Sequence, residues 1–156
     1  MKGTAFKFGD NISTDHIAPG RLFHLRSNLP EFAKHVLEDA DETFASRMKK
    51  GDFVVAGNNF GLGSSREHAP QIIKIAGVGA VLAKSFARIF YRNAINIGLL
   101  AIECDTDGID AGDELDLDIE KGCIHNLTKG TMIAIEPLPP VMIKLLNDGG
   151  LVEHIK

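Results

Sequence analysis

The central part of the chain restricts the fold most, because buried-type strands alternate there with helices. Runs of small and branched apolar residues predict strands at residues 53–56, 80–83 and 99–102. Apolar residues at helical spacing predict helices between them, at residues 71–76 and 86–97. A strand–helix–strand–helix–strand order with short connections favours parallel strands in one sheet. The pattern therefore predicts an α/β fold with a parallel strand–helix centre.

The segment before this centre predicts one strand, two loops and a helix. Residues 2–7 predict a first strand, and residues 9–16 are dense in small polar residues, which indicates an ordered loop. A second loop, residues 19–30, leads into a helix predicted at residues 31–37. The apolar residues of that helix fall on one stripe: Phe32, Ala33, Val36 and Leu37.

The segment after the centre predicts additional β-hairpins. Residues 113–119 alternate acidic and apolar side chains, and residues 131–135 form another β-type run. Lysine–glycine pairs at residues 121–122 and 129–130 predict turns. The prolines of residues 137–140 then open a short predicted helix with these apolar residues: Val141, Met142, Leu145 and Leu146.

The bulk composition of residues 1–156 fits a single globular domain without repeats or linkers. Hydrophobic residues make up 44% and charged residues 24%, which is ordinary for such a domain. The net charge of −4 gives no global attraction to nucleic acid or to an anionic membrane, so we expect neither as a partner. A local group of arginines can still bind a small anionic substrate.

The cysteines and the apolar runs predict a cytoplasmic protein. The two cysteines, Cys104 and Cys123, form no Cys-x-x-Cys pair, which favours reduced thiols. They are too few to hold a four-iron cluster alone, because such a cluster takes three or four thiolates. Residues 1–10 lack a basic-then-apolar leader, and no apolar run is long enough to span a bilayer.

The polar segment between the first strand and the first helix of the centre predicts an anion-binding site. Main-chain N–H groups at the start of a helix favour an anion, and Gly61 and Gly63 let the backbone approach a ligand closely. Ser64 and Ser65 offer hydroxyl groups, and Arg66 offers a planar fork for a carboxylate.

The boundaries of the two central helices are predicted from their capping residues. For the first, Ser64 and Glu67 fit a capping box, but Pro70 prefers the first helical position, so its start stays open. For the second, Ser85 is a candidate N-cap and Gly98 a candidate C′ residue.

The common phosphate and hydrolase motifs do not fit the polar segment. A P-loop needs a lysine before the serine, and none is present. A dinucleotide fingerprint would need glycine at position 66, where Arg66 stands, and a nucleophile elbow around Ser65 would need glycine in place of Glu67.

Three motifs resemble the swivelling domain of the aconitase superfamily. Residues 61–69, Gly-Leu-Gly-Ser-Ser-Arg-Glu-His-Ala, are similar to its G-x-G-S-S-R-E-H-A signature. Residues 9–17 resemble its G-D-x-x-x-T-D-H/Q-I loop, and residues 84–96 match a third segment. Order and spacing are similar to the small subunits of isopropylmalate isomerases and homoaconitases, although Leu62 replaces a frequent cysteine. The resemblance implies a swivelling β/β/α domain.

The resemblance also implies a reaction shared between two chains. A large subunit would hold a [4Fe–4S] cluster, and this chain would close over it in a heterodimer or heterotetramer. The family removes water from a small hydroxy di- or tricarboxylate and adds it back at the neighbouring carbon. One iron acts as a Lewis acid on the hydroxyl group, while a serine alkoxide takes the proton. Ser64 matches that serine.

The resemblance implies further roles for polar residues around Ser64. Ser65 and Arg66 match contacts to a substrate carboxylate, and Arg66 would also stabilise the serine alkoxide. Asp15 and His16 match a polar loop that lines the cleft, with an Asx-turn as an equal alternative. A pair of arginines at helical spacing, Arg88 and Arg92, matches family positions and is expected to be structural.

The loop that follows the motif of residues 9–17 corresponds to the segment that selects the substrate in this family. Leu25-Arg26-Ser27 resembles the homoaconitase pattern, in which an arginine pairs a distal carboxylate, and a solvated Arg26 is the alternative. Isopropylmalate, the substrate in leucine synthesis, is the family default.

An anion-binding module without catalysis is an alternative of another class. A serine hydrolase using His68 is a further one, although His68 is close in sequence for a triad.

Overall fold

The computed structural model describes residues 1–135, 138, 140 and 143–144. Within this part, the strands are β1 (Lys2–Lys7), β2 (Phe53–Val55), β3 (Ala80–Ala83), β4 (Ala101–Glu103), β5 (Glu114–Asp118), β6 (Cys123–Asn126) and β7 (Thr131–Ala134). They form one sheet in the order β4-β3-β2-β1-β5-β6-β7. The predicted terminal helix with Val141, Met142, Leu145 and Leu146 lies outside the described residues.

The sheet has a parallel half and an antiparallel half that meet at β1. Strands β1 to β4 pair in parallel, with Phe6 opposite Val54 and Val81 opposite Ala101. Strand β1 also pairs antiparallel with β5, and β6 and β7 extend that half. Every residue of β2 and β3 is buried, as expected for parallel strands covered on both faces. Strand β5 buries alternate residues, which is the pattern of a strand with one solvent-exposed face.

The sequence patterns predict most of these strands correctly. The strands predicted at residues 2–7, 53–56, 80–83, 113–119 and 131–135 are confirmed within a residue or two. The strand predicted at 99–102 lies two residues later, as β4, and the patterns do not predict β6. Both predicted lysine–glycine turns are confirmed, because Gly122 and Gly130 adopt positive φ angles of 69° and 71°.

The helices are α1 (Thr14–Ile17), the 3₁₀ segment η1 (Gly20–Ser27), α2 (Leu29–Ala33), α3 (Phe44–Arg47), α4 (His68–Ala76) and α5 (Arg88–Asn96). Both central helices are confirmed. The helix predicted at residues 31–37 is found at Leu29–Ala33, because the residues after Ala33 form tighter turns with i→i+3 hydrogen bonds, such as the one from the N–H of Val36 to the carbonyl oxygen of Ala33 at 3.2 Å. All four residues of its predicted stripe are nevertheless buried. The loop predicted at 9–16 contains the first turn of α1.

The helix starts differ from the predicted caps. Helix α4 begins at His68 without a side-chain cap, so the capping box of Ser64 and Glu67 is wrong. Helix α5 also lacks a side-chain cap, because the Ser85 hydroxyl accepts a hydrogen bond from the N–H of Asn59 instead, at 2.8 Å. Gly98 follows the last helical turn with a φ of 80°, which confirms it as the C′ residue.

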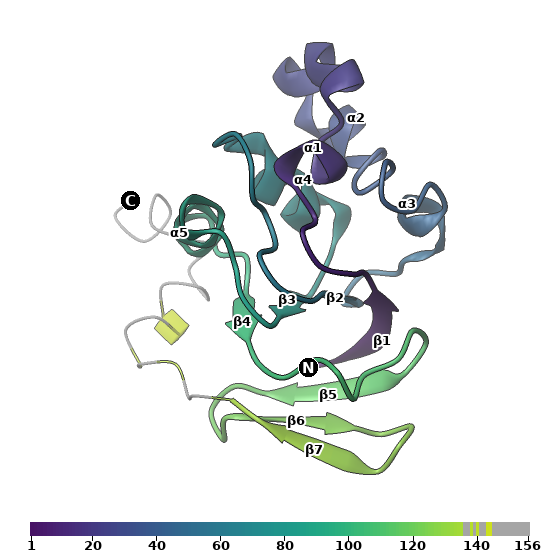
Figure 1. The fold of residues 1–156 in the computed structure, drawn as a ribbon, viewed down its shortest axis with the longest axis vertical. Coiled ribbons are helices and arrows are strands. Elements are labelled where there is room, and N and C mark those ends of the chain that lie inside the picture. Colours follow the sequence, from purple (N-terminus) through teal and green to yellow (C-terminus); the bar gives the residue numbers. More distant parts are fainter. Residues whose placement is uncertain (136–137, 139, 141–142, 145–156) are drawn as a thin grey trace.

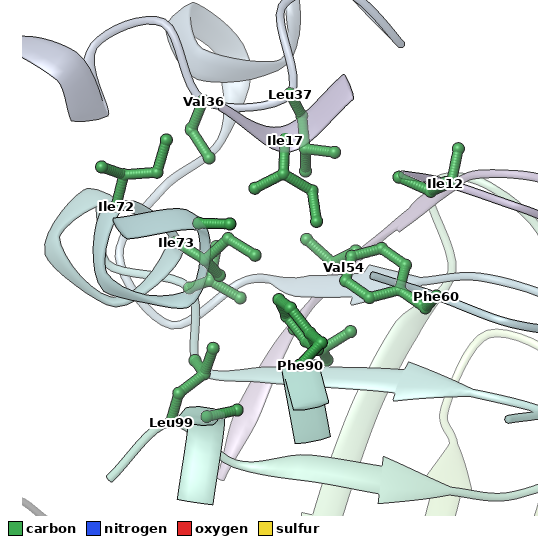
Figure 2. Packing of buried hydrophobic residues seen from close by; sticks show 14 of the residues in the cluster. Ile12, Ile17, Val36, Leu37, Val54, Phe60, Ile72, Ile73, Phe90 and Leu99 are labelled. Carbon is green, nitrogen blue, oxygen red and sulfur yellow. The ribbon is translucent and has the colours of Figure 1, made fainter. Parts of the chain in front are cut away.

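Two apolar clusters cover the faces of the parallel strands. Figure 1 shows α1, α2 and α4 on one side of these strands and β5–β7 on the other. The cluster under the helices includes the side chains of Figure 2, among them Ile17, Val54, Phe60, Ile72 and Phe90. The second cluster joins residues of β2 and β3 to Leu115, Leu117 and Ile124 of the antiparallel half. The carboxyl ends of the parallel strands carry the loops described next.

Candidate active site

The three motifs that are far apart in the sequence lie side by side in the structure. Isolated bridges join Ser13 to Leu62 and Phe60 to Phe86. The N–H of Thr14 donates to the carbonyl oxygen of Leu62 at 2.8 Å, and the N–H of Gly61 donates to that of Ile12 at 2.7 Å. The loop after β2 is therefore held between the segment that enters α1 and the segment that enters α5.

Gly61 is required by the approach of α5 to this loop. Its φ is 87°, and a Cβ atom at this position would lie 2.3 Å from the ring of Phe90. Gly63 has a φ of 105°, but a Cβ there would meet only side-chain atoms at ordinary or slightly short distances, Thr14 Oγ1 at 3.3 Å and Ser13 Cβ at 3.9 Å. The close approach at Gly61 is thus an approach to a packed aromatic ring, which sets the position of α5 beside the loop.

A cavity of about 260 Å³ lies between the loop and α5. Ser64, Ser65 and Arg66 border it from the loop, and Arg88 and Asn93 border it from α5. Among the described residues, the only charged side chains that line it are those of the two arginines. Both serines are exposed to solvent. The cavity is therefore an open, positively charged site with two solvent-exposed serine hydroxyl groups, suited to a small carboxylate.

Arg66 is held against Ser64 by a chain of hydrogen bonds. Its Nε donates to Ser64 Oγ at 3.2 Å, and its Nη1 donates to Asp15 Oδ1 at 3.1 Å and to the carbonyl oxygen of Ala18 at 2.9 Å. Asp15 Oδ1 also accepts from the N–H of Gly20 at 2.9 Å. The guanidinium group is mostly buried, with 23% of the side chain exposed. A fixed cation therefore lies against the Ser64 hydroxyl group, and Asp15 is one of the groups that hold it there.

The backbone of Ser64 is also fixed from the opposite side. Thr14, at the first position of α1, donates a hydrogen bond from Oγ1 to the carbonyl oxygen of Ser64 at 2.9 Å. Thr14 is itself almost completely buried. The serine is thus positioned by groups from two separate segments, which limits the movement of its hydroxyl group.

The structure does not bring His16 to this cavity. His16 Nδ1 accepts from the N–H of Ser13 at 2.9 Å, and the Ser13 hydroxyl caps α1 in return. The ring borders a different hollow, beside Asp39 and Asp41. The capping box therefore holds the His16 ring away from the Ser64 cavity, and a position of His16 in a cleft to a partner subunit stays a prediction.

Arg26 lies near the cavity but does not line it. It is exposed on η1, donates from Nη1 to the carbonyl oxygen of Phe23 at 3.1 Å, and stacks over the Phe23 ring at 4.4 Å. The guanidinium group of Arg66 is 5.9 Å from the centre of the same ring. Both guanidinium groups therefore lie close to the same Phe23 ring, although neither Phe23 nor Arg26 lines the cavity.

His68 supports the helix start rather than acting on a serine. Its ring stacks on Phe32 at 5.4 Å and meets Phe23 edge-on at 5.6 Å. Nε2 is buried without a hydrogen-bond partner in the described part of the chain. Burial, and then the charges of Arg66 and Arg26, lower the pKa of His68. The ring does not line the cavity, so His68 is not placed as the base that the serine hydrolase alternative gave it.

Arg88 lines the cavity, which the sequence interpretation did not predict. It was expected to be structural, but it is the first residue of α5, is exposed, and lines the cavity. The side chains of Arg88 and Arg92 make no hydrogen bond or ion pair with any residue that the structure describes. The sequence did contain a signal for Arg88, because the third family motif, residues 84–96, extends through this helix. The sequence did not show which face of the helix meets the loop.

The two cysteines and the remaining acidic residues do not form a metal site in the described part of the chain. No group of three or more histidine, cysteine, aspartate or glutamate residues there could hold a metal ion. Cys104 is half-buried, and burial, followed by the charge of Asp105, raises the pKa of its thiol to about 11. Cys123 is buried on β6. Among the same residues, no helix is long and apolar enough to cross a membrane.

Comparison with known proteins agrees with the fold and the loop geometry. The family model described as the aconitase C-terminal domain matches residues 11–107, which include the cavity-lining segments. The chain belongs to the aconitase C-terminal domain family.

The chain also resembles proteins over its whole length, and the relatives described here are small subunits of one enzyme. The chain is 64% identical to 3-isopropylmalate dehydratase small subunit 2 of Archaeoglobus fulgidus, with 100% of this chain and 94% of that protein covered. It is 60% identical to small subunit 1 of the same enzyme from Thermotoga maritima, with 100% and 95% covered. The crystal structure of 3-isopropylmalate dehydratase from Methanocaldococcus jannaschii has a TM-score of 0.92 and 47% identity, with 99% and 92% covered. The predicted family and fold class are confirmed.

Proposed function

We propose that the chain is the small subunit of a 3-isopropylmalate dehydratase, a hydro-lyase that isomerises a hydroxy dicarboxylate by removing and restoring water. The observation that carries the proposal is the contact of Arg66 Nε with Ser64 Oγ in a cavity whose charged side chains are arginines. The identity of 64% and 60% to named small subunits supports the same reaction.

The reaction requires a base for a proton on the carbon beside a carboxylate, and Ser64 supplies it. A serine hydroxyl is a very weak acid, so its alkoxide needs a nearby positive charge. Arg66 provides this charge, while Asp15 and Thr14 hold the arginine and the serine backbone in place. Ser64 Oγ takes the proton, the C–H electron pair forms a double bond, and hydroxide leaves the neighbouring carbon. In the return step water adds, and Ser64 gives the proton back.

The rest of the site belongs to a large partner subunit in this proposal. The family resemblance implies a [4Fe–4S] cluster, and the described residues of this chain offer no ligand set that fits one. When bound in the large subunit, such a cluster supplies a Lewis acid for the hydroxyl group. The exposed position of Ser64 and Ser65 leaves them accessible to such a partner. The stoichiometry of the complex and a cytoplasmic location stay predictions from the sequence.

A substrate with an additional distal carboxylate is the second candidate. Its support is Arg26, which shares the Phe23 ring with Arg66. A homoaconitase-type substrate would extend from Ser64 past this ring toward Arg26. The Arg26 side chain is exposed and, among the described residues, makes its hydrogen bond and its cation–π contact with Phe23 and no ion pair, so it is free to reorient.

Anaerobic reconstitution with a large subunit tests the proposal. The complex should convert isopropylmalate to its unsaturated product, followed by absorbance, with homocitrate assayed in parallel. Ser64→Ala should abolish turnover but retain association and ligand binding, whereas Ser65→Ala should raise KM and leave turnover measurable, because Ser65 is expected to contact the substrate carboxylate and not to take the proton. Turnover by this chain alone, or an unaffected Ser64→Ala complex, would refute the role given to Ser64. Faster turnover of homocitrate would favour the second candidate.

A further inference from the structure

We propose that His16 is a positioning residue for the proposed reaction. Its imidazole closes the capping box at the start of α1 and so holds the side chains of that helix against the loop that carries Ser64. The role rests on the proposed function, because it concerns the proton transfer assigned to Ser64. It acts through the geometry of α1, whereas the family resemblance implies that His16 lines a cleft.

The capping box of α1 uses an imidazole at the position where glutamate or glutamine usually stands. The Ser13 hydroxyl accepts a hydrogen bond from the N–H of His16 at 3.1 Å. In return, His16 Nδ1 accepts from the N–H of Ser13 at 2.9 Å. A ring nitrogen accepts a hydrogen bond only when it carries no proton, so the box requires the neutral ring with its proton on Nε2.

Helix α1 is too short to be stable without such contacts. Its four residues form little more than one turn, and a first turn fixes several dihedral angles for very few hydrogen bonds. Packing fixes the end of the helix, because Ile17 is completely buried in the same cluster as Val54 and Phe60 (Figure 2). At the start of the helix, the box satisfies two N–H groups.

Two contacts that fix the candidate base and its cation leave from this one turn. Thr14, the first residue of α1, donates from Oγ1 to the carbonyl oxygen of Ser64 at 2.9 Å. Asp15, the second residue, accepts from Arg66 Nη1 at 3.1 Å. His16 is the next residue of the same turn. Its bond with the cap therefore helps to set the orientation from which both contacts leave.

A direct contact of His16 with the substrate or the large subunit is the alternative role. The ring borders a hollow with Asp39 and Asp41 and does not line the Ser64 cavity. An asparagine at position 16 would place its amide oxygen where Nδ1 lies, with no counterpart of Nε2. A leucine has the shape of asparagine without the acceptor. Asparagine should therefore preserve a positioning role but not a contact made by Nε2.

The test compares His16→Asn with His16→Leu in the anaerobically reconstituted complex. His16→Leu should lower kcat for isopropylmalate by about 10- to 100-fold, the loss expected when catalytic groups are misplaced by about 1 Å, and should raise KM less. His16→Asn should keep kcat within about threefold of the wild type, the range that its lower helix propensity allows. Equal kcat values for the two variants would overturn the positioning role, and so would failure of both variants to associate with the large subunit.

Amide hydrogen exchange in the free chain tests the box without turnover. The N–H of Thr14 donates to the carbonyl oxygen of Leu62, and the N–H of Ala18 donates to that of Thr14. His16→Leu should speed the exchange of both N–H groups by about 2- to 30-fold, the effect of losing one cap, whereas His16→Asn should keep them protected. Unchanged exchange in His16→Leu would overturn the inference.

The same measurement separates the inference from the proposed function. A wild-type complex that turns over no isopropylmalate would refute the proposed function. Faster exchange in His16→Leu than in His16→Asn would then still support the role of His16 in holding α1.

Discussion

Replacement of Gly61 by alanine should destabilise the chain through two separable effects. The first is backbone strain, because an L-residue at a φ of 87° is disfavoured by about 1–2 kcal/mol. The second is overlap, since the new Cβ would lie 2.3 Å from Cγ and 2.5 Å from Cβ of Phe90. Phe90 is 3% exposed and packed in the main cluster, so it cannot swing into solvent. Overpacking of this kind costs about 1–3 kcal/mol.

The two effects together predict a loss of about 2–5 kcal/mol in the free energy of unfolding. A domain of this size is stable by only about 5–15 kcal/mol, so the loss is a large fraction of the total. Equilibrium unfolding in urea measures it, with a fall in Tm of roughly 2–4 °C per kcal/mol as a second readout.

Two matched variants identify the contribution of the overlap with Phe90. Gly63→Ala has comparable strain at a φ of 105°, but its nearest neighbour is Thr14 Oγ1 at 3.3 Å, so it should lose only about 1–2 kcal/mol. In a Phe90→Ala background, Gly61→Ala should likewise lose only the strain part. If Gly61→Ala is no worse than Gly63→Ala, or is as harmful without the Phe90 ring, the packing explanation is wrong.

Two further predictions concern the groups that hold the site. Asp15→Asn should change stability by less than about 1 kcal/mol, because the ion pair with Arg66 is largely exposed on the aspartate side, 63%. It should nevertheless lower kcat of the complex more than it raises KM, since Arg66 loses the partner that fixes it against Ser64; an unchanged kcat would contradict this positioning role. His68 has a lowered pKa in the fold, so the unfolded chain binds more protons as the pH falls through the ordinary histidine range. The urea midpoint should therefore fall between pH 7.5 and 5.5, and His68→Asn should reduce that fall; an equal fall in both proteins would show that other groups cause it.

The parts of the fold that were predictable depend on local patterns. The parallel centre follows from short apolar runs and helical periodicity, which each segment carries by itself. Strand β6 was missed because Cys-Ile-His-Asn is short, and its pairing with β5 and β7 comes from distant partners. Ser85 was misplaced as a cap because its hydroxyl group bonds the N–H of Asn59 across two loops. The local sequence around Ser85 does not reveal that a distant N–H group will use its hydroxyl group.

In the candidate site, too, some features follow from the local sequence and others only from the tertiary structure. The sequence by itself determined the polar segment with Ser64 and Arg66, because its glycines, hydroxyl groups and guanidinium are contiguous along the chain. Only the tertiary structure decided that Asp15 holds Arg66 and that the capping box turns His16 away. It also decided that Arg88 faces the cavity, because the packing of the Phe90 ring against Gly61 sets the rotation of α5. Contacts between segments separated by many residues arise from this packing, so no local pattern predicts them.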